Sequence, residues 1–353
     1  MITNKIKHRI FAFWAIFSVF FNYLNIKIQN TVRAEVNYSK AECVMEKESR
    51  RILYESNGEL RLPMASTTKI ATAITVLENC KDLKRSFSIP KEAVGIDGSS
   101  VYLKEGDNYS TEELLYGLML RSGNDAATAL AIKTAGSINK FSKKMNETAE
   151  KAGALNTNFK NPHGLPCKDH YTTARDLSYI TCYALHNNKF KEIVSTKYYQ
   201  ERNWANKNKM LKLYPFSIGV KTGYTKEAGR CLVSAAKKED MTLVCTVLSS
   251  RDMYNRSITL LNSCFEKYKK TKLIDKDRPI SLVINGKTIM TTAKTDFFYP
   301  LCDGEHEHLE IITSAQENQM KNLSSINKKE EICGKIEIYL LKRLIFSGNL
   351  YKL

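Results

Sequence analysis

Several familiar sequence signals are missing from this chain, and each absence excludes a class of protein. The nine cysteines contain no Cys-x-x-Cys pair and no other spacing that suits a metal ion. There is no cluster of five or more lysines and arginines, no DNA- or RNA-binding motif and no internal repeat. What remains is a globular chain of 353 residues, long enough for a sizeable core and two domains. We expect no nucleic-acid partner, no metal and no cofactor.

The cysteines are odd in number and scattered, which argues against a disulfide framework. Several of them, such as Cys231 and Cys245, fall in apolar runs. We therefore expect mostly buried thiols.

Charge of one sign is in excess, since the formal net charge is +17. A basic surface suits an anionic neighbourhood such as membrane headgroups or wall polymers. The positive residues are spread along the chain, however, so a solvated lysine-rich surface remains an alternative.

The N-terminal segment reads as an export signal. Lys5, Lys7 and Arg9 precede the apolar run 10–24, which is too short for a comfortable membrane span. Ala34 closes a small-residue site of the kind that signal peptidases cleave. We expect export with cleavage after Ala34, and an uncleaved N-terminal anchor is the alternative.

A helix starting near Ser66 is the centre of the sequence. Pro63 ends the preceding extended run, and residues 70–77 are apolar or small on nearly every face, which is typical of a buried helix. Ser66 and Lys69 are three residues apart and share a face. Burial lowers the pKa of a lysine, and a serine beside such a base is an activated nucleophile. The motif alone is weak, because Ser-x-x-Lys occurs four more times in the chain, at Ser88, Ser137, Ser234 and Ser325.

The remaining patterns predict an α+β protein in which helices flank an antiparallel sheet. Capping boxes at 110–113 and 173–176 open helices, and the apolar runs 229–236 and 241–249 read as a sheet hairpin. A long helix is expected at 253–271, and short alternating strands follow from residue 280. We expect a signal peptide at 1–34, a catalytic domain at 35–272 and a small all-β domain at 273–353.

Two further motifs complete a constellation. Ser122-Gly123-Asn124 lies in a break between two helices, and Lys221-Thr222-Gly223 lies on a strand that begins a hairpin. The set Ser-x-x-Lys, Ser-x-Asn and Lys-Thr-Gly, in this order, is found in β-lactamases and penicillin-binding proteins. The sequence resembles the low-molecular-mass penicillin-binding proteins, which are serine-type D-alanyl-D-alanine carboxypeptidases, over about residues 37–270 and more loosely beyond. The stretches 161–165, 171–177 and 219–225 strengthen this resemblance.

The resemblance implies a β-lactamase/transpeptidase-like fold with a mostly helical subdomain. It also implies peptidoglycan stem peptides as substrate and β-lactams as inhibitors. In the reaction it implies, Ser66 attacks the penultimate carbonyl and Lys69 takes its proton.

The other site residues follow from the same resemblance. The backbone N–H groups of Ser66 and Tyr224 receive the oxyanion, and Ser122 passes a proton to the departing D-alanine. Asn124 contacts the substrate amide. The residues expected around the substrate carboxylate and backbone are Lys221, Thr222 and Gly223, with Arg256 as a second carboxylate contact.

The sequence also departs from related enzymes. Ala152 stands where class A β-lactamases have the loop glutamate that drives deacylation. We therefore prefer a carboxypeptidase to the alternative of a β-lactamase or broader serine hydrolase. His163 is a tempting base, although a structural loop histidine is the favoured interpretation. A non-catalytic wall-binding or β-lactam-sensing protein is the second alternative. The C-terminal end, 336–350, alternates like strands rather than as the membrane-lying amphipathic helix in which many relatives end. Peripheral attachment to a membrane through this end is the less favoured alternative.

Overall fold

The computed structural model describes residues 39–284, 286–315 and 332–353. The proposed signal segment, 1–34, lies outside these residues. Among the residues that are described, no helix is both long and apolar enough to cross a lipid bilayer.

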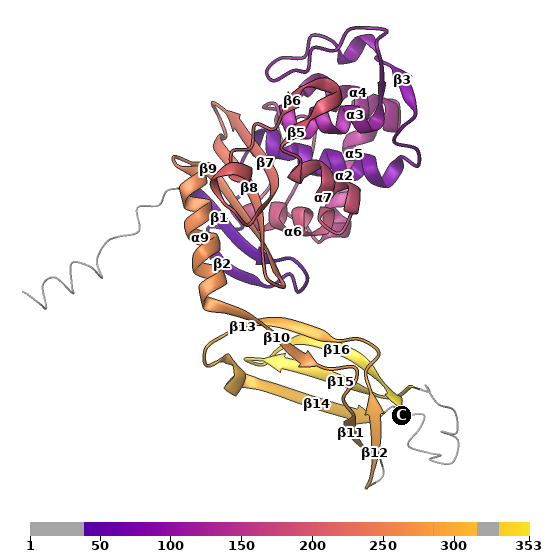
Figure 1. Ribbon diagram of the computed structural model, residues 1–353, viewed down its shortest axis with the longest axis vertical. Coiled ribbons are helices and arrows are strands. Elements are labelled where there is room, and N and C mark those ends of the chain that lie inside the picture. The colour runs from indigo at the N-terminus through magenta and orange to yellow at the C-terminus, as the bar shows by residue number, and fades with distance from the viewer. Residues whose placement is uncertain (1–38, 285, 316–331) are drawn as a thin grey trace, which may run out of the picture. The chain divides into compact units, whose positions relative to one another are not determined.

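A five-stranded antiparallel sheet carries the site (Figure 1). Its strand order is β2-β1-β9-β8-β7, which leaves β7 at one edge. The expected hairpin is present, because β8 and β9 pair from Lys238↔Met241 to Leu232↔Val247. The strands of this sheet are β1 (Ser39–Glu46), β2 (Ile52–Ser56), β7 (Ser217–Thr225), β8 (Gly229–Lys238) and β9 (Met241–Ser250).

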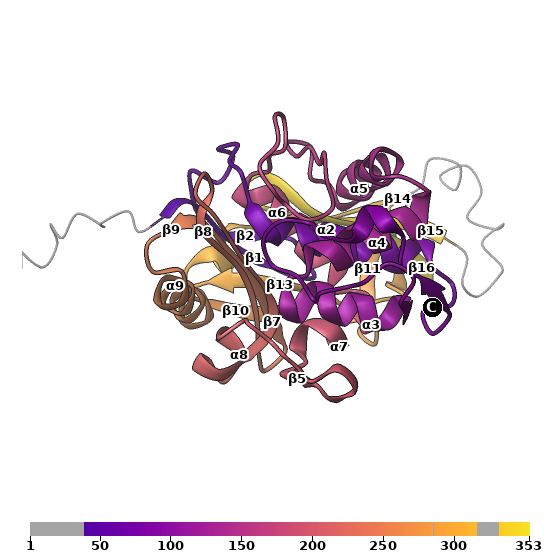
Figure 2. The same ribbon diagram turned by 90° about the horizontal axis from the view of Figure 1, so that it is seen from above.

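The two faces of this sheet are covered by different helices. In β1 the alternation of side chains sends Cys43 and Met45 into the core that includes α2, whereas Val44 packs in the core beneath α9. Figure 2 shows α9 on one side of β7–β9 and α2 on the other. The covering helices are α2 (Lys69–Asn79), α6 (Ala174–Ala184) and α7 (Asn188–Ser195) on one face and α9 (Met253–Lys267) on the other.

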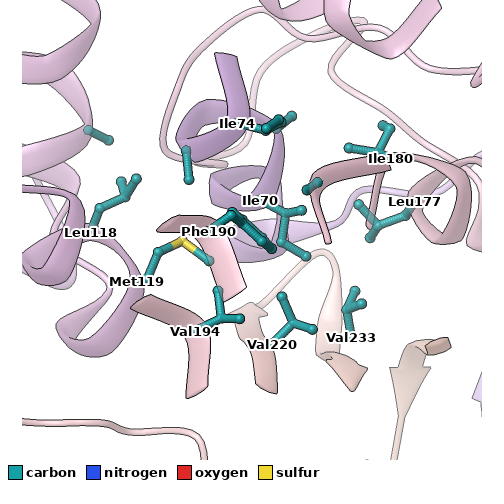
Figure 3. Close-up of a cluster of buried hydrophobic side chains, with 14 of the residues drawn as sticks. Ile70, Ile74, Leu118, Met119, Leu177, Ile180, Phe190, Val194, Val220 and Val233 are labelled. Atoms are coloured by element: carbon teal, nitrogen blue, oxygen red, sulfur yellow. The ribbon is translucent and has the colours of Figure 1, made fainter. Parts of the chain in front are cut away.

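The helix α2 lies at the middle of the larger core. Residues 69–76 are all buried, as the apolar pattern predicted. Figure 3 shows Ile70 and Ile74 of this helix in one cluster with Leu177, Phe190 and Val194. Dense packing on all sides fixes the start of α2, which is where the nucleophile is expected.

A helical subdomain packs against α2. The predicted capping box at its entrance is formed, since the Ser110 side chain accepts from Glu113 N–H and the Glu113 side chain accepts from Ser110 N–H. The elements of this subdomain are β3 (Ser86–Ser88), η2 (Lys91–Ala93), β4 (Asn108–Ser110), α3 (Thr111–Tyr116), the π-turn η3 (Gly117–Arg121), α4 (Asn124–Ala135) and α5 (Ile138–Ala152).

The segment between α6 and the sheet contains a helix that the sequence analysis did not predict. This helix, α7, follows α6, and the side chain of Asn187 accepts from the N–H of Phe190 at its start. Phe190, Ile193 and Val194 are buried at helical spacing, so periodicity was the signal that could have identified this helix. The short elements before β7 are β5 (Tyr198–Tyr199), η4 (Gln200–Arg202), β6 (Trp204–Ala205) and α8 (Met210–Leu213).

The C-terminal part is all β, as expected, and has its own apolar core. The helix α9 ends at Lys267 rather than near residue 271, because β10 begins at Tyr268. The proposed domain boundary at 272 therefore falls inside β10. The C-terminal elements are β10 (Tyr268–Ile274), β11 (Ile280–Ile284), β12 (Lys287–Thr292), β13 (Phe297–Cys302), η5 (Glu305–His308), β14 (Leu309–Ala315), β15 (Ile332–Leu340) and β16 (Arg343–Lys352).

Two smaller predictions about the chain are confirmed. All nine cysteines are free thiols, and six of them are buried. The C-terminal end forms the hairpin β15–β16, in the sheet of order β11-β12-β16-β15-β14.

Candidate active site

The expected nucleophile lies in a tight turn directly before α2. This turn, η1 (Ala65–Thr68), is a 3₁₀ turn that leads into the helix, and Ala65 enters it with φ +50°. Thr67 Oγ1 donates to Met64 O at 2.6 Å, which closes the turn on itself. Ser66 is half-buried and lies where the first N–H groups of a helix have no partner within the helix.

Lys69 is fully buried and makes three contacts. Its Nζ lies 2.9 Å from Ser66 Oγ, 2.6 Å from Asn124 Oδ1 and 2.7 Å from His163 O. Burial, and then the charge of Lys221, hold the pKa of Lys69 well below its ordinary value. The amine is therefore neutral in a larger fraction of molecules than a surface lysine would be.

The contacts of Lys69 also assign the direction of each hydrogen bond. Asn124 Nδ2 donates to Asp97 O at 2.5 Å, so its Oδ1 is the atom that faces the amine. Asn124 Oδ1 and His163 O can only accept, so they take the two N–H bonds of a neutral amine. The remaining lone pair then faces Ser66 Oγ, which is the arrangement a general base needs.

The loop 156–171 supplies structure rather than a base. It is His163 O, not the ring, that contacts Lys69, and the ring Nδ1 accepts from Leu165 N–H at 3.2 Å. Burial and the charge of Lys69 lower the pKa of His163 to about 3, so the ring is neutral. A Cβ on Gly164 would lie 1.9 Å from Ala65 O, which shows how closely this loop packs on η1. The interpretation of His163 as a structural loop histidine agrees with these contacts.

Ser122-Gly-Asn lies at the junction of η3 and α4. Ser122 has φ +66° and ends the π-turn, and it is 6% exposed. Asn124 N–H donates to Ser99 O at 2.7 Å. Asp125 accepts from Ser100 Oγ at 2.5 Å and from Val101 N–H at 3.1 Å, and so fixes the segment beside Asn124. No motif in the sequence marks this supporting role of Asp125.

The edge strand β7 brings the third motif to the turn that carries Ser66, the expected nucleophile. Lys221 is 2% exposed, and burial, followed by the charge of Lys207, lowers its pKa to about 7. A Cβ on Gly223 would lie 2.9 Å from Met64 O and 3.0 Å from Ser66 N, so only glycine fits here without displacing backbone. The strand therefore runs directly against the turn that carries Ser66.

Thr222, in the middle of this motif, and Tyr224, directly after it, differ in exposure. Thr222 is half-buried and its carbonyl accepts from Lys221 Nζ at 3.0 Å. Tyr224 is 66% exposed at the open edge of the sheet. The expected oxyanion donors, the N–H groups of Ser66 and Tyr224, thus come from the two backbone segments that Gly223 brings together.

Lys207 is a third lysine near the site that the sequence did not reveal. Its N–H donates to Leu120 O at 3.0 Å and its Nζ to Ser99 Oγ at 3.4 Å. Its charge contributes to the lowered pKa values of both Lys69 and Lys221. It follows β6 outside any motif, so nothing in the sequence distinguished it from other surface lysines.

Arg256 contacts other residues of the chain. Its Nε and Nη2 bind the two carboxylate oxygens of Glu42 at 2.9 and 2.7 Å, and Nη2 also donates to Tyr54 Oη at 3.0 Å. Because residues i and i+2 of a strand point to the same face, Glu42 lies with Val44 on the face of β1 that α9 covers. Lys221 of β7 pairs with Val233 of β8, and Val233 belongs to the core on the other face of the sheet, the face that α2 covers. Arg256 therefore anchors α9 to the sheet, and its expected contact with the substrate carboxylate stays a prediction.

Comparison with known proteins agrees with this geometry. Residues 28–252, well over half of the chain, match the Peptidase_S11 family, D-alanyl-D-alanine carboxypeptidase. The chain is 33% identical over 259 residues to the D-alanyl-D-alanine carboxypeptidase DacF of Bacillus subtilis, covering 69% of this chain and 67% of that one.

Two solved structures have the same architecture. The first is penicillin binding protein 5 of Haemophilus influenzae, with a TM-score of 0.74, 26% identity, and coverage of 90% of this chain and 96% of that one. The second is the Streptomyces K15 DD-transpeptidase, with a TM-score of 0.61, 34% identity, and coverage of 65% and 97%. The extent of the family match and the identity to the Bacillus relative establish that this chain belongs to the D-alanyl-D-alanine carboxypeptidase family.

Proposed function

We propose that this protein is a serine-type D-alanyl-D-alanine carboxypeptidase that removes the terminal D-alanine from peptidoglycan stem pentapeptides. Membership of the family supports the reaction class. The observation that carries the residue assignment is the 2.9 Å contact between Ser66 Oγ and a fully buried Lys69 amine. A neutral amine in that position can take the hydroxyl proton as the oxygen attacks.

Acylation uses the three motifs together. Ser66 Oγ attacks the carbonyl of the penultimate D-alanine while Lys69 accepts the proton. The N–H groups of Ser66 and Tyr224 donate to the developing oxyanion. Lys221, protonated in part because its pKa is about 7, attracts the terminal carboxylate, and Thr222 donates to the same group.

Release of the products completes the cycle. Ser122, 6% exposed, relays the proton that Lys69 took from Ser66 to the departing D-alanine nitrogen, and Asn124 holds the substrate amide. Water then attacks the ester on Ser66 while Lys69 takes its proton and returns it to Ser66 Oγ, which frees the shortened peptide. Asn124 Oδ1 and His163 O keep the Lys69 amine aimed at the ester throughout, because each accepts one of its N–H bonds.

The same site explains inhibition by β-lactams. The serine attacks the lactam carbonyl as it would the peptide carbonyl, and the ester forms in a site with no loop glutamate at 152 to activate water. The His163 ring does not replace that glutamate, since its Nδ1 accepts from Leu165 N–H. No observation favours the alternative of a β-lactamase.

The place of action follows from the substrate. Peptidoglycan lies outside the cytoplasmic membrane, so we propose that residues 1–34 direct export and that residues 35–272 act as the D,D-peptidase domain. The β domain, proposed at 273–353, contains none of the residues assigned to the reaction.

Release of D-alanine from a synthetic pentapeptide tests this proposal. The wild-type chain should release D-alanine, and Ser66→Ala should release none while keeping its fold. Ser88→Ala is a matched control, because Ser88 also stands three residues before a lysine but is exposed on β3. Equal release by wild type and Ser66→Ala, or release by neither, would refute the assignment.

A further inference from the structure

His170 joins the turn that carries Ser66 to the loop 156–171. Its Nε2 lies 3.0 Å from the Oγ1 of Thr68, which stands in η1 shortly after the expected nucleophile. Both side chains are buried, since His170 is 7% exposed and Thr68 is fully enclosed. A hydrogen bond between buried groups is costly to lose, because no water replaces the missing partner. This contact therefore holds the turn to the loop.

The second ring nitrogen fixes the direction of this hydrogen bond. His170 Nδ1 lies 3.0 Å from the backbone nitrogen of Lys160, and a backbone N–H can only donate, so Nδ1 carries a lone pair. Burial lowers the pKa of His170 to about 4, so the ring is neutral at neutral pH and has one N–H. That hydrogen stands on Nε2, which donates to Thr68 Oγ1. The two nitrogens thus hold two separate segments of the chain.

Thr68 transmits this constraint to the nucleophile. It is the N-cap residue of α2, where a threonine hydroxyl usually accepts from an N–H of its own helix. Here the hydroxyl faces His170 instead. A branched Cβ leaves the side chain little rotational freedom, so a contact that fixes Oγ1 also fixes the backbone of Thr68. That backbone leads directly from Ser66 to Lys69.

The same loop holds the site at a second point. His163 O accepts from Lys69 Nζ at 2.7 Å. A Cβ on Gly164 would lie 2.8 Å from Thr68 Oγ1, so the backbone of the loop packs directly against the hydroxyl that His170 holds. One loop therefore sets the position of the base and of the turn that carries the nucleophile.

We propose that His170 is a positioning residue, which acts through Thr68 to keep the hydroxyl and the N–H of Ser66 in the geometry of attack. The inference rests on the proposed carboxypeptidase function and adds a residue that lies outside the three motifs. Both groups of Ser66 act on the transition state, so loss of the contact slows acylation and leaves peptide binding unchanged. A misplacement of about 1 Å can cost on the order of 100-fold in rate.

Two amide substitutions separate the roles of the two ring nitrogens. In His170→Gln the amide nitrogen can stand where Nε2 stands, so the donor to Thr68 is kept. In His170→Asn the amide oxygen can stand where Nδ1 stands, so the acceptor for the Lys160 N–H is kept and the contact with Thr68 is lost. Stopped-flow acylation by benzylpenicillin should be about 10- to 100-fold slower in His170→Asn than in wild type. His170→Gln should stay close to the wild-type rate, and release of D-alanine from a pentapeptide should follow the same order.

A change on the other side of the contact provides a second test. Thr68→Val removes the hydroxyl, keeps the branched shape and should slow acylation by a similar factor. Combined with His170→Asn it should add little, because both changes remove the same contact. Thr75→Val is the matched control, since Thr75 is a buried threonine of the same helix whose hydroxyl contacts Thr148 Oγ1 at 3.1 Å. This control should be acylated at the wild-type rate.

Stability and binding separate positioning from a general effect on the fold. Urea unfolding of each variant, and peptide binding in the Ser66→Ala background, are measured alongside. If His170 positions the turn, acylation follows the contact with Thr68 rather than the loss of stability, and the peptide still binds. Equal acylation of His170→Asn and His170→Gln, or wild-type acylation of Thr68→Val, would overturn the inference. A wild-type chain that penicillin does not acylate would instead count against the proposed carboxypeptidase.

Discussion

Lys69 and Lys221 are buried amines whose protonation states must differ for the site to work. Lys69 acts as a base only when neutral, and burial lowers its pKa well below the ordinary value. Lys221 attracts a carboxylate only when charged, and its pKa is lowered to about 7. The pH dependence of kcat/KM reports these groups in the free enzyme.

The lowered pKa of Lys221 predicts how kcat/KM changes on the alkaline side of its pH profile. As pH rises through about 7, Lys221 loses its proton, and kcat/KM for a peptide with a free carboxylate should fall. Arginine stays charged at every accessible pH, so Lys221→Arg should move the fall to higher pH even if the activity is lower overall. A Lys221→Arg profile that falls at the same pH as wild type would show that another group sets this limb.

Gly223 makes a second prediction about a single residue. A Cβ would come within 2.9 Å of Met64 O and 3.0 Å of Ser66 N, so Gly223→Ala must displace the turn that carries the nucleophile. A misplacement of about 1 Å can cost on the order of 100-fold in rate. Stopped-flow acylation by a penicillin should show a loss of that order, while circular dichroism shows a folded protein. Wild-type acylation by this variant would contradict the tight approach of β7.

Some residues of the candidate site could be predicted from the sequence because motifs carry them. Ser66, Lys69 and Lys221 each belong to a short pattern in a suitable local context. The carbonyl of His163 could not be identified, because any residue supplies a carbonyl and only the fold brings this one to within 2.7 Å of Lys69. Lys207 was missed for a similar reason, since its relation to the two amines depends on contacts far apart in the sequence.

Among the secondary-structure elements, α2 and the β8–β9 hairpin follow from strong local patterns, whereas the role of α9 depends on a long-range pair. The buried ion pair between Arg256 and Glu42 joins α9 to β1, and Glu42 is fully buried. The sequence does not show which face of the sheet an arginine at the start of a helix will contact. The pairing of Arg256 with Glu42 could therefore not be predicted from the sequence.

The ion pair predicts a loss of stability rather than of catalysis. Arg256→Ala leaves a buried carboxylate without its charged partner, which costs about 3–5 kcal/mol of unfolding free energy. Urea unfolding should show this loss, and penicillin acylation of the folded fraction should keep its wild-type rate constant. Glu42→Gln/Arg256→Met should recover part of the stability. A stable Arg256→Ala with a raised KM for the peptide would instead support a substrate contact.

For the whole molecule, the fold class and the order of the domains could be predicted because the three motifs occur in the order that is typical of one known fold. The end of α9 was predicted four residues too late, since Tyr268 continues a helical pattern but pairs with Cys302 in a strand. The C-terminal part has a core of its own, and the residues proposed for the reaction all lie before residue 225. The central claim for the whole chain is that one serine among its many carries the acyl group.

Mass spectrometry of the penicillin adduct tests that claim most directly. After brief exposure to benzylpenicillin and digestion, the account predicts one adduct per chain, on the peptide that contains Ser66. Ser66→Ala should carry none, and Lys69→Met should acquire the adduct far more slowly. An adduct on any other residue, or equal labelling of Ser66→Ala, would contradict the account.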